Sequence, residues 1–333
     1  MVHSSWSVHM SILANNLYVL SQIAMARHGD LDCPLPNQVR FSDLKNESIR
    51  DFTSLVTERF GRTWEGDLRQ GDLDIRMLAK KLEGLPQSTS PEIMHTFRER
   101  DLPDTGMVIF FPGQHGMARA FHRFADLIDD RHSVLGFDYD GLDERIGPSK
   151  SMVSSVECFH RRMLERHAGL LDRLAENGGE VVLFGFCLGG CYAHEFARRL
   201  LQEHDLKVRL VIFDGHPAEW YSVTGTRELF RKTKRALKQA RTRGSIDRLL
   251  VRQGRRQIHL LGKHRSGKVD VPALLLRSSS VHESWGLSKE SWTPHVGSCR
   301  QVDLPDLSHL DLFQRRQEKR IFHYLEPGFS EAC

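Results

Sequence analysis

The sequence predicts an α/β domain with a mostly parallel sheet, preceded by a small all-α helical unit. Residues beyond about 106 alternate between short β-rich apolar runs and longer segments with helical periodicity. Residues 1–85 show helical spacing alone, and a Gly-, Pro- and Ser-rich stretch followed by a polar run separates the two parts. We therefore predict a helical domain at 1–85, a linker at 86–105 and a larger domain at 106–327.

Composition excludes several classes of protein. The chain has 333 residues, enough for about two domains, and its 40% hydrophobic and 27% charged residues argue against wholesale disorder. No apolar run is long enough to predict a membrane span, and no Lys or Arg precedes Arg27 in the apolar N-terminal stretch, which argues against a secretory signal. The six cysteines fit no disulfide framework, so we expect free thiols and a cytoplasmic location.

The leading unit shows three stretches of helical spacing. Apolar residues recur at helical intervals between 13 and 24, between 52 and 60 and between 75 and 82. Three or four helices around a small core are the simplest architecture for such a segment.

The larger domain begins with the buried-strand run Val-Ile-Phe-Phe at 108–111, and helix 117–129 follows with its aromatic and aliphatic residues on one side. A strand at 132–138 leads to a long helix at 151–176, whose apolar residues recur every three or four positions. The later predicted elements are strand 180–184, a helix from about 188 to 204, and strands at 208–213, 271–276 and near 301–302. This alternation with short connections implies parallel strands covered by helices.

Directly after strand 180–184 stands Gly-Phe-Cys-Leu-Gly-Gly at 185–190, the G-x-S-x-G pattern of a nucleophile elbow with cysteine in place of serine. An elbow holds its nucleophile in a strained turn, and Gly185 and Gly189 leave the room that this turn requires. The next helix directs its N-terminus at the turn, which favours a thiolate and a developing oxyanion. The pattern predicts Cys187 as a nucleophile, with a buried structural cysteine as the alternative.

Candidates for the acid and the base follow Cys187 in the chain order that an α/β-hydrolase requires, which is nucleophile, acid and then base. Asp214 ends the next strand, 27 residues after Cys187, and His309 follows the last strand. The turn after the first strand contains Gly113, whose N–H would form an oxyanion hole together with the N–H of Leu188. His115 in the same turn is either a substrate contact or a loop residue.

With these residues, the region from about 106 to 325 resembles the type I thioesterase domains of nonribosomal peptide and polyketide synthases, which have an α/β-hydrolase fold with a helical lid. The resemblance rests on Phe-Phe-Pro-Gly at 110–113, the elbow at 185–190, Asp214, and the Leu-Asp-Leu-Phe that follows His309. It implies Cys187 as the acylated nucleophile, His309 as the general base and Asp214 as the acid that orients it. It also implies a lid at about 218–268, and carrier proteins and megasynthase modules as partners.

The cysteine departs from the serine that most of the family carry. Acyl transfer from a carrier thioester to Cys187 exchanges one thioester for another, so the acyl group stays activated, whereas serine would form an oxyester. A thiolate paired with histidine also attacks at neutral pH without proton removal in that step. We therefore expect transfer of an acyl or aminoacyl group to another thiol, or ring closure, as well as hydrolysis.

Residues 41–49 resemble the modification site of acyl and peptidyl carrier proteins, and residues 60–82 resemble the last two helices of those proteins. The resemblance implies a carrier-protein-like bundle with 4′-phosphopantetheine on Ser48; modification of Ser48 would mean delivery of the substrate in cis, and delivery by a separate carrier is the other possibility. The sequence departs from the family pattern at Lys45 and Glu47, where glycine and aspartate are usual. The alternative is that Ser48 is a plain helix N-cap.

The predicted lid is strongly basic. Residues 227–268 contain 15 Lys and Arg against Glu228 and Asp247, so this stretch carries +13 in a chain whose net charge is +4. A solvated helical face and a phosphate track for nucleic acid are two interpretations. Phe230 is nearly the only aromatic residue available there for base stacking, which makes nucleic acid a poor partner and an acidic carrier protein a better one.

The sequence contains no Walker loop, dinucleotide fingerprint or metal-spaced His/Cys motif, so neither a nucleotide nor a metal is expected. It therefore predicts a thioesterase or acyltransferase that acts on carrier-bound thioesters in secondary-metabolite biosynthesis. The alternatives are a non-catalytic docking protein with a hydrolase fold and a general α/β-hydrolase unrelated to carrier proteins.

Overall fold

In a computed structural model of the chain, the structure describes residues 21, 41–60, 68–69, 77–78, 81, 93–100, 106–114, 116, 118–140, 148–223, 245–278, 287–307, 309 and 321–327. The chain forms two compact units. The smaller unit comprises Met1–Glu92, Asp143–Arg145 and Lys234–Val251, and the larger comprises Ile93–Leu142, Ile146–Thr233 and Arg252–Cys333.

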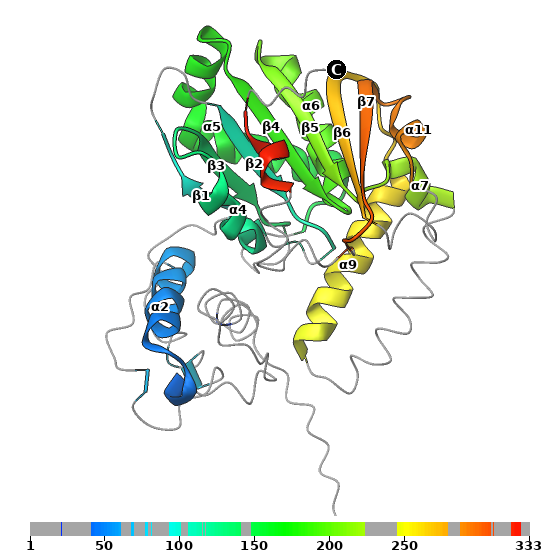
Figure 1. The fold of residues 1–333 in the computed structure, drawn as a ribbon. Coiled ribbons are helices and arrows are strands. Elements are labelled where there is room, and N and C mark those ends of the chain that lie inside the picture. Colours follow the sequence, from blue (N-terminus) through cyan, green and yellow to red (C-terminus); the bar gives the residue numbers. More distant parts are fainter. Residues whose placement is uncertain are drawn as a thin grey trace, which may run out of the picture. The chain divides into compact units, whose positions relative to one another are not determined.

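The larger unit is built on a seven-stranded sheet with the order β1-β3-β2-β4-β5-β6-β7 (Figure 1). The strands are β1 (Met94–Arg98), β2 (Met107–Phe111), β3 (Ser133–Phe137), β4 (Glu180–Phe186), β5 (Lys207–Phe213), β6 (Val269–Ser278) and β7 (Val296–Leu304). All neighbouring pairs are parallel except β1 with β3. The predicted α/β architecture with a mostly parallel sheet is thereby confirmed.

Strand β1 lies inside the stretch that the sequence predicts as a linker. It pairs antiparallel with β3, with Met94 opposite Phe137, and Met94 is buried. Arg98, which makes this stretch look solvent-exposed, donates to the carbonyl oxygens of Ile128, Asp129 and His132. A short edge strand whose polar residues are satisfied locally lacks the apolar pattern of a central strand, so the sequence does not reveal it.

Helices cover both faces of the sheet. They are α4 (His122–Leu127), α5 (Met152–Glu176), α6 (Gly189–Glu203), α7 (Ala218–Val223), α9 (Ser245–Lys263) and α11 (Lys289–Trp292), with 3₁₀ turns η2 (Ala118–Phe121) and η4 (Phe322–Leu325). Because side chains alternate along a strand, Phe111 packs with Phe159 and Phe196 of α5 and α6, while Phe110 stacks on Phe121 at 4.9 Å between ring centroids. Among the described helices, none is both long and apolar enough to span a bilayer.

In the smaller unit, the described elements are a 3₁₀ turn, η1 (Phe41–Asp43), and helix α2 (Asn46–Phe60). The rings of Phe41 and Phe52 lie 5.0 Å apart, and Leu44 and Val56 are also buried. The helix predicted between 52 and 60 therefore belongs to a longer helix, whereas the other two predicted helices fall largely outside the described residues. The carrier-like bundle stays a prediction.

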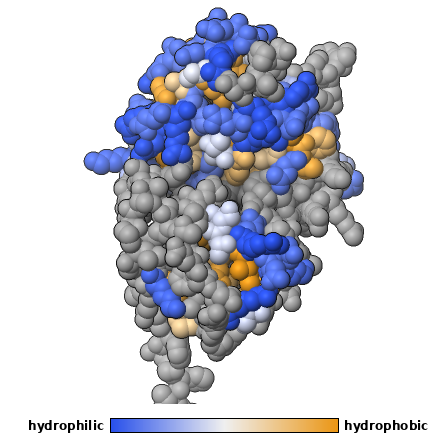
Figure 2. Space-filling view, turned by 90° about the vertical axis from the view of Figure 1, so that its left-hand side faces the viewer, coloured by the Kyte–Doolittle hydropathy of each residue, from blue (hydrophilic) through white to orange (hydrophobic). Residues whose placement is uncertain are grey.

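Polar and charged side chains dominate the described surface. Figure 2 shows one face of the molecule on which hydrophilic residues prevail and apolar areas are small. Over the part of the chain that the structure describes, Met77 is the one exposed large hydrophobic residue. The apolar side chains of the sheet are thus buried in the core. The polar groups at the strand ends are therefore the candidates for a functional site.

Candidate active site

Cys187 occupies the turn between β4 and α6. Its φ of 54° lies in the left-handed region that residues other than glycine rarely adopt. Its amide donates to the carbonyl oxygen of Phe213 at 2.8 Å, which holds the turn against the end of β5. The side chain is partly exposed, so the thiol sits on a strained turn within reach of a ligand.

Three glycines allow the chain to pack around this turn. A Cβ on Gly189 would lie 2.1 Å from the carbonyl oxygen of Phe111, and one on Gly185 would lie 2.4 Å from the Cα of Gly190. A Cβ on Gly215 would lie 2.6 Å from the carbonyl oxygen of Cys187. All three contacts are with backbone atoms that cannot move aside, so the steric need for Gly185 and Gly189 predicted from the elbow pattern is confirmed.

His309 and Asp214 lie together beside this turn, although 95 residues separate them in the sequence. Nδ1 of His309 is 3.0 Å from Oδ2 of Asp214. Because an ionised carboxylate only accepts hydrogen bonds, Nδ1 carries the proton of this pair. The imidazole also hydrogen-bonds to the thiol of Cys187. The structure therefore brings the three residues predicted as nucleophile, base and acid into one hydrogen-bonded chain.

The charge state of His309 is set by its neighbours. Burial lowers its pKa, but the negative charge of the Cys187 thiolate and hydrogen bonds to Asp214 and Cys187 outweigh burial and raise the pKa to about 10. The imidazole is therefore protonated at neutral pH whenever the thiol is ionised. An imidazolium beside a thiolate is a pair suited to nucleophilic attack on a carbonyl carbon.

Two further side chains, which the sequence pattern does not reveal as site residues, orient this pair. The hydroxyl of Ser278 donates to Oδ2 of Asp214 at 2.5 Å, and its N–H donates to Oδ1 at 2.7 Å. The ring of Phe186 stacks on the imidazole of His309, with centroids 4.7 Å apart and planes inclined by 23°. Two signals were available: Ser278 is a polar residue just beyond a predicted strand, and Phe186 directly precedes the nucleophile.

The two predicted oxyanion donors flank Cys187. A Cβ on Gly113 would lie 3.4 Å from the Cβ of Cys187, so the backbone of the turn after β2 runs directly beside the nucleophile. Leu188 has helical dihedral angles at the start of α6, where N–H groups have no acceptor within the helix. The backbone of both residues thus lies beside Cys187, whereas His115 lies outside the described residues.

The family model of the thioesterase domain matches residues 107–327, about two thirds of the chain. The chain belongs to the thioesterase domain family. A comparison with curated proteins finds no match.

Solved structures show the fold of this thioesterase. The holo form of AB3403, a four-domain nonribosomal peptide synthetase bound to AMP and glycine, matches 97% of the chain with a TM-score of 0.60 and 16% identity. RedJ with polyethylene glycol in its active site matches 72% of the chain and 97% of its own length, with a TM-score of 0.50 and 20% identity. The chain spans about a quarter of the synthetase, 26% of its length. These likenesses confirm the α/β-hydrolase fold.

The described part of the predicted lid of the thioesterase includes α7 and α9. A Cβ on Gly254 of α9 would lie 2.4 Å from the Cγ of Gln114, so α9 packs on the loop that contains Gly113. Gln253 and Arg256 donate to the carbonyl oxygen of Asp140 at 3.1 and 3.3 Å. Arg256 therefore anchors α9 to the domain. The cations of the proposed phosphate track, at 231–243, lie outside the described residues.

Ser48 lies in the first turn of α2, and its exposed fraction is 0%. The N–H of Ile49 donates to the carbonyl oxygen of Lys45 at 3.1 Å, so the helix starts before Ser48 and the N-cap interpretation is wrong. Beside it lies a cavity of about 280 Å³ lined by Asn46, Glu47, Ile49, Arg50 and Arg69. A modifying enzyme would reach the Ser48 hydroxyl only if this first turn opened.

Proposed function

We propose that this thioesterase takes an acyl group from a carrier-bound thioester onto Cys187 and then passes it to an acceptor. The observation that carries the proposal is the contact chain from Asp214 through His309 to Cys187, with a 3.0 Å bond between the carboxylate and the imidazole. The thioesterase family supplies the class of reaction.

In the first half-reaction, the thiolate of Cys187 attacks the thioester carbonyl. The N–H groups of Gly113 and Leu188 donate to the oxyanion that develops on the carbonyl oxygen. Collapse of the tetrahedral intermediate breaks the carbon–sulfur bond to the carrier, and the imidazolium of His309 gives its proton to the departing thiolate. The product is an acyl-cysteine of nearly the same free energy as the starting thioester.

In the second half-reaction, the acceptor attacks the acyl-cysteine. The now neutral imidazole of His309 removes a proton from water, an amine or a thiol as that group attacks, and the Asp214 carboxylate stabilises the imidazolium that forms. Thiolate is then released from Cys187 beside that imidazolium, which regenerates the starting ion pair. Because a thioester is more reactive than an oxyester, the cysteine favours transfer to a thiol or an amine over a purely hydrolytic role.

We place this reaction in nonribosomal peptide or polyketide biosynthesis. The chain's likeness to a four-domain peptide synthetase extends over nearly its whole length, which supports a carrier-like unit ahead of the thioesterase. The basic stretch at 227–268 would attract an acidic carrier protein by long-range electrostatics. Carrier proteins, in cis or in trans, are therefore the proposed acyl donors.

For delivery in cis, Ser48 would carry 4′-phosphopantetheine. Incubation of the full chain with a pantetheinyl transferase and coenzyme A should add the mass of phosphopantetheine to wild type and not to Ser48→Ala. A known carrier protein in the same tube serves as the positive control for modification. If that carrier is modified and the wild-type chain gains no mass, the acyl substrate must be delivered by a separate carrier.

The test of the main proposal is mass spectrometry of the full chain after incubation with an acyl-loaded carrier protein. Wild type should gain one acyl group on Cys187, Cys187→Ala should gain none, and Cys299→Ala, which removes another partly buried thiol, should behave as wild type. An adduct that persists in Cys187→Ala would refute the proposal. In the docking-protein alternative, iodoacetamide at pH 6 would alkylate Cys187 no faster than an ordinary thiol.

A further inference from the structure

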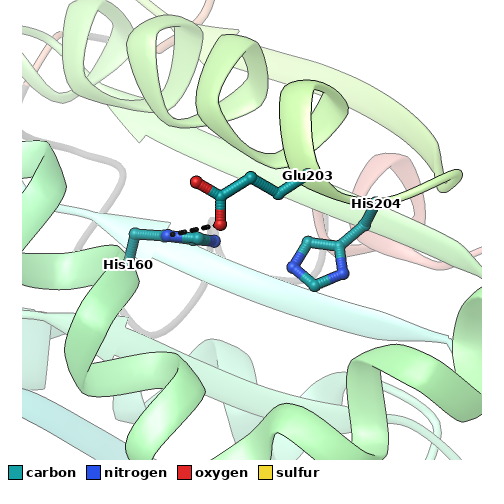
Figure 3. Close-up of side chains that lie close together, drawn as sticks. All are labelled: His160, Glu203 and His204. Atoms are coloured by element: carbon teal, nitrogen blue, oxygen red, sulfur yellow. Dashed lines mark ion pairs between the residues drawn. The ribbon is translucent and has the colours of Figure 1, made fainter.

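Three side chains of metal-binding type meet near the end of α6 that is remote from Cys187. They are His160 of α5 together with Glu203 and His204 at the C-terminal end of α6, and one ligand atom from each lies within 4.8 Å of the others (Figure 3). Cys187 precedes the other end of the 15-residue helix α6, so about 22 Å of helix separates the cluster from the candidate active site. The cluster takes no part in the proposed acyl transfer.

The spacing within the cluster suits a metal ion better than a direct contact. Nδ1 of His160 lies 3.6 Å from Oε2 of Glu203, beyond the usual range of a hydrogen bond. One imidazole supplies only one nitrogen to an ion, and the ligand atoms that the three side chains offer all lie within 4.8 Å of one another, a spacing that a tetrahedral zinc ion can draw together. The imidazole of His204 lies beside this pair, with its centroid 5.9 Å from that of His160, so a small rotation of the ring would add a third ligand.

Unpartnered nitrogen atoms are the second observation. Nε2 of His160 and Nε2 of His204 are both buried, and neither has a hydrogen-bond partner within the described part of the chain. Burial of a polar atom without a partner costs free energy, so such atoms call for an explanation. Two of them side by side, next to a carboxylate, fit the donor set of a cation that prefers imidazole ligands.

The surroundings of the cluster favour its metal-binding form. Arg199 pairs with Oε1 of Glu203 at 2.6 Å, which leaves Oε2 for a metal and holds the carboxylate as an outer ligand commonly does.

We propose that His160, Glu203 and His204 form a zinc site that fastens α5 to the end of α6, with water as the fourth ligand. The sequence conceals it because 43 residues separate His160 from Glu203, whereas a recognisable zinc motif keeps its ligands in close pairs. Because the proposed zinc site lies at the end of α6 that is remote from the Cys187 thiol, its role is to stabilise the fold. Zinc should raise the melting temperature of the protein and leave the acyl transfer rate unchanged.

The test uses the full chain, freed of metal and kept reduced, titrated with Zn²⁺ against a competing chelator. Wild type should bind one tight equivalent of zinc, and His204→Ala and Glu203→Gln should each weaken that binding at least tenfold. His259→Ala, which removes an exposed histidine of α9, and Cys158→Ser, which removes a free thiol two residues before His160, should bind as wild type.

The same titration followed by thermal unfolding gives a second measurement. Zinc should raise the melting temperature of wild type and of Cys158→Ser, and it should raise that of His204→Ala much less. The proposal is overturned if wild type binds no tight zinc, if His204→Ala binds zinc as tightly as wild type, or if Cys158→Ser alone loses the site. Since acyl transfer at Cys187 is measured separately, failure here would leave the proposed function standing.

Discussion

Ser278 donates a hydrogen bond to each oxygen of the Asp214 carboxylate, from its N–H to Oδ1 at 2.7 Å and from its hydroxyl to Oδ2 at 2.5 Å. The same Oδ2 lies 3.0 Å from Nδ1 of His309. Parallel pairing of β5 with β6 brings Ser278 beside Asp214. The N–H of Asp214 donates to the carbonyl oxygen of Leu276 at 3.0 Å. The direction in which Asp214 faces the imidazole is thus set by a residue of the neighbouring strand.

Replacement of Ser278 by alanine should slow the chemistry without weakening substrate binding. The backbone N–H still holds one carboxylate oxygen, so we expect kcat to fall about tenfold, equivalent to about 1.4 kcal/mol of barrier, with KM unchanged. Steady-state kinetics with a small-molecule thioester measure both constants. The matched control is Ser155→Ala, which removes a buried hydroxyl that donates to Asp140 at 2.9 Å. Equal losses of kcat in the two variants would assign Ser278 a merely structural role.

Gly113→Ala should damage the oxyanion hole. The added Cβ would lie 2.7 Å from the ring of Phe186 and 3.4 Å from the Cβ of Cys187, so the loop or the ring must shift. Loss of one donor of this type costs about 10²–10³-fold in kcat, and we expect a loss in that range.

The control for this variant is Gly169→Ala in α5. A Cβ there meets only the guanidinium end of Arg173, at 3.4 Å. It should leave kcat unchanged and raise stability slightly, by about 0.5–1 kcal/mol, because alanine is the better helix former. Wild-type kcat in Gly113→Ala would argue against the assignment of Gly113.

Cys187→Ser should change the dependence of acylation on pH. In wild type the pKa of His309 is raised to about 10, so its imidazolium persists to high pH and acyl-enzyme formation should decline only toward pH 10. Serine carries no charge, so the pKa of His309 should fall below that of wild type even though Asp214 still raises it, and the serine variant needs the neutral imidazole as a base. Its rate should therefore rise with pH through this lower pKa.

Rapid-quench measurement of acyl-enzyme across this pH range tests the prediction. The control is Cys299→Ser, which should retain the wild-type profile because Cys299 lies on β7 rather than at the elbow. Superimposable profiles for wild type and Cys187→Ser would show that the thiolate does not set the charge of His309.

The main parts of the candidate site could be predicted because each lies at a strand end that local sequence reveals. Cys187 follows an apolar run and is flanked by glycines, and Asp214 ends the next such run. Ser278 could not be found in this way, because its role depends on which strand pairs with β5 and on hydrogen-bond geometry. The cluster of His160, Glu203 and His204 was hidden for the same reason, since it is formed by packing of α5 on α6.

The departures from the predicted fold have physical causes of the same kind. Strand β1 falls inside the predicted linker because its stretch is polar and charged, yet three carbonyl oxygens accept hydrogen bonds from the guanidinium of Arg98. Ser48 resembles an exposed modification site or a cap in sequence, but the preceding turn starts the helix early and directs its side chain inward. The local sequence pattern predicts neither the pairing of β1 with the sheet nor the burial of Ser48.

Acid should destabilise the larger unit through His216. This residue is 1% exposed, its ring stacks on Trp220 at 4.1 Å, and within the described residues neither ring nitrogen has a partner. Burial lowers its pKa to about 4. Between about pH 6.5 and 4, His216 is protonated in the unfolded chain but stays neutral in the folded state. The free energy of unfolding therefore falls as pH falls through this range, by up to about 3 kcal/mol.

His216→Phe keeps an aromatic ring against Trp220 and removes this titration. Urea unfolding at several pH values between about 7 and 4.5 should show a smaller loss of stability for the variant than for wild type. His132, His194 and His264, whose pKa values are also lowered by burial, should leave a residual loss in both proteins. His259→Phe, at an exposed position of α9, should retain the full wild-type loss. Parallel curves for wild type and His216→Phe would mean that His216 gains a proton in the folded state as easily as in the unfolded chain.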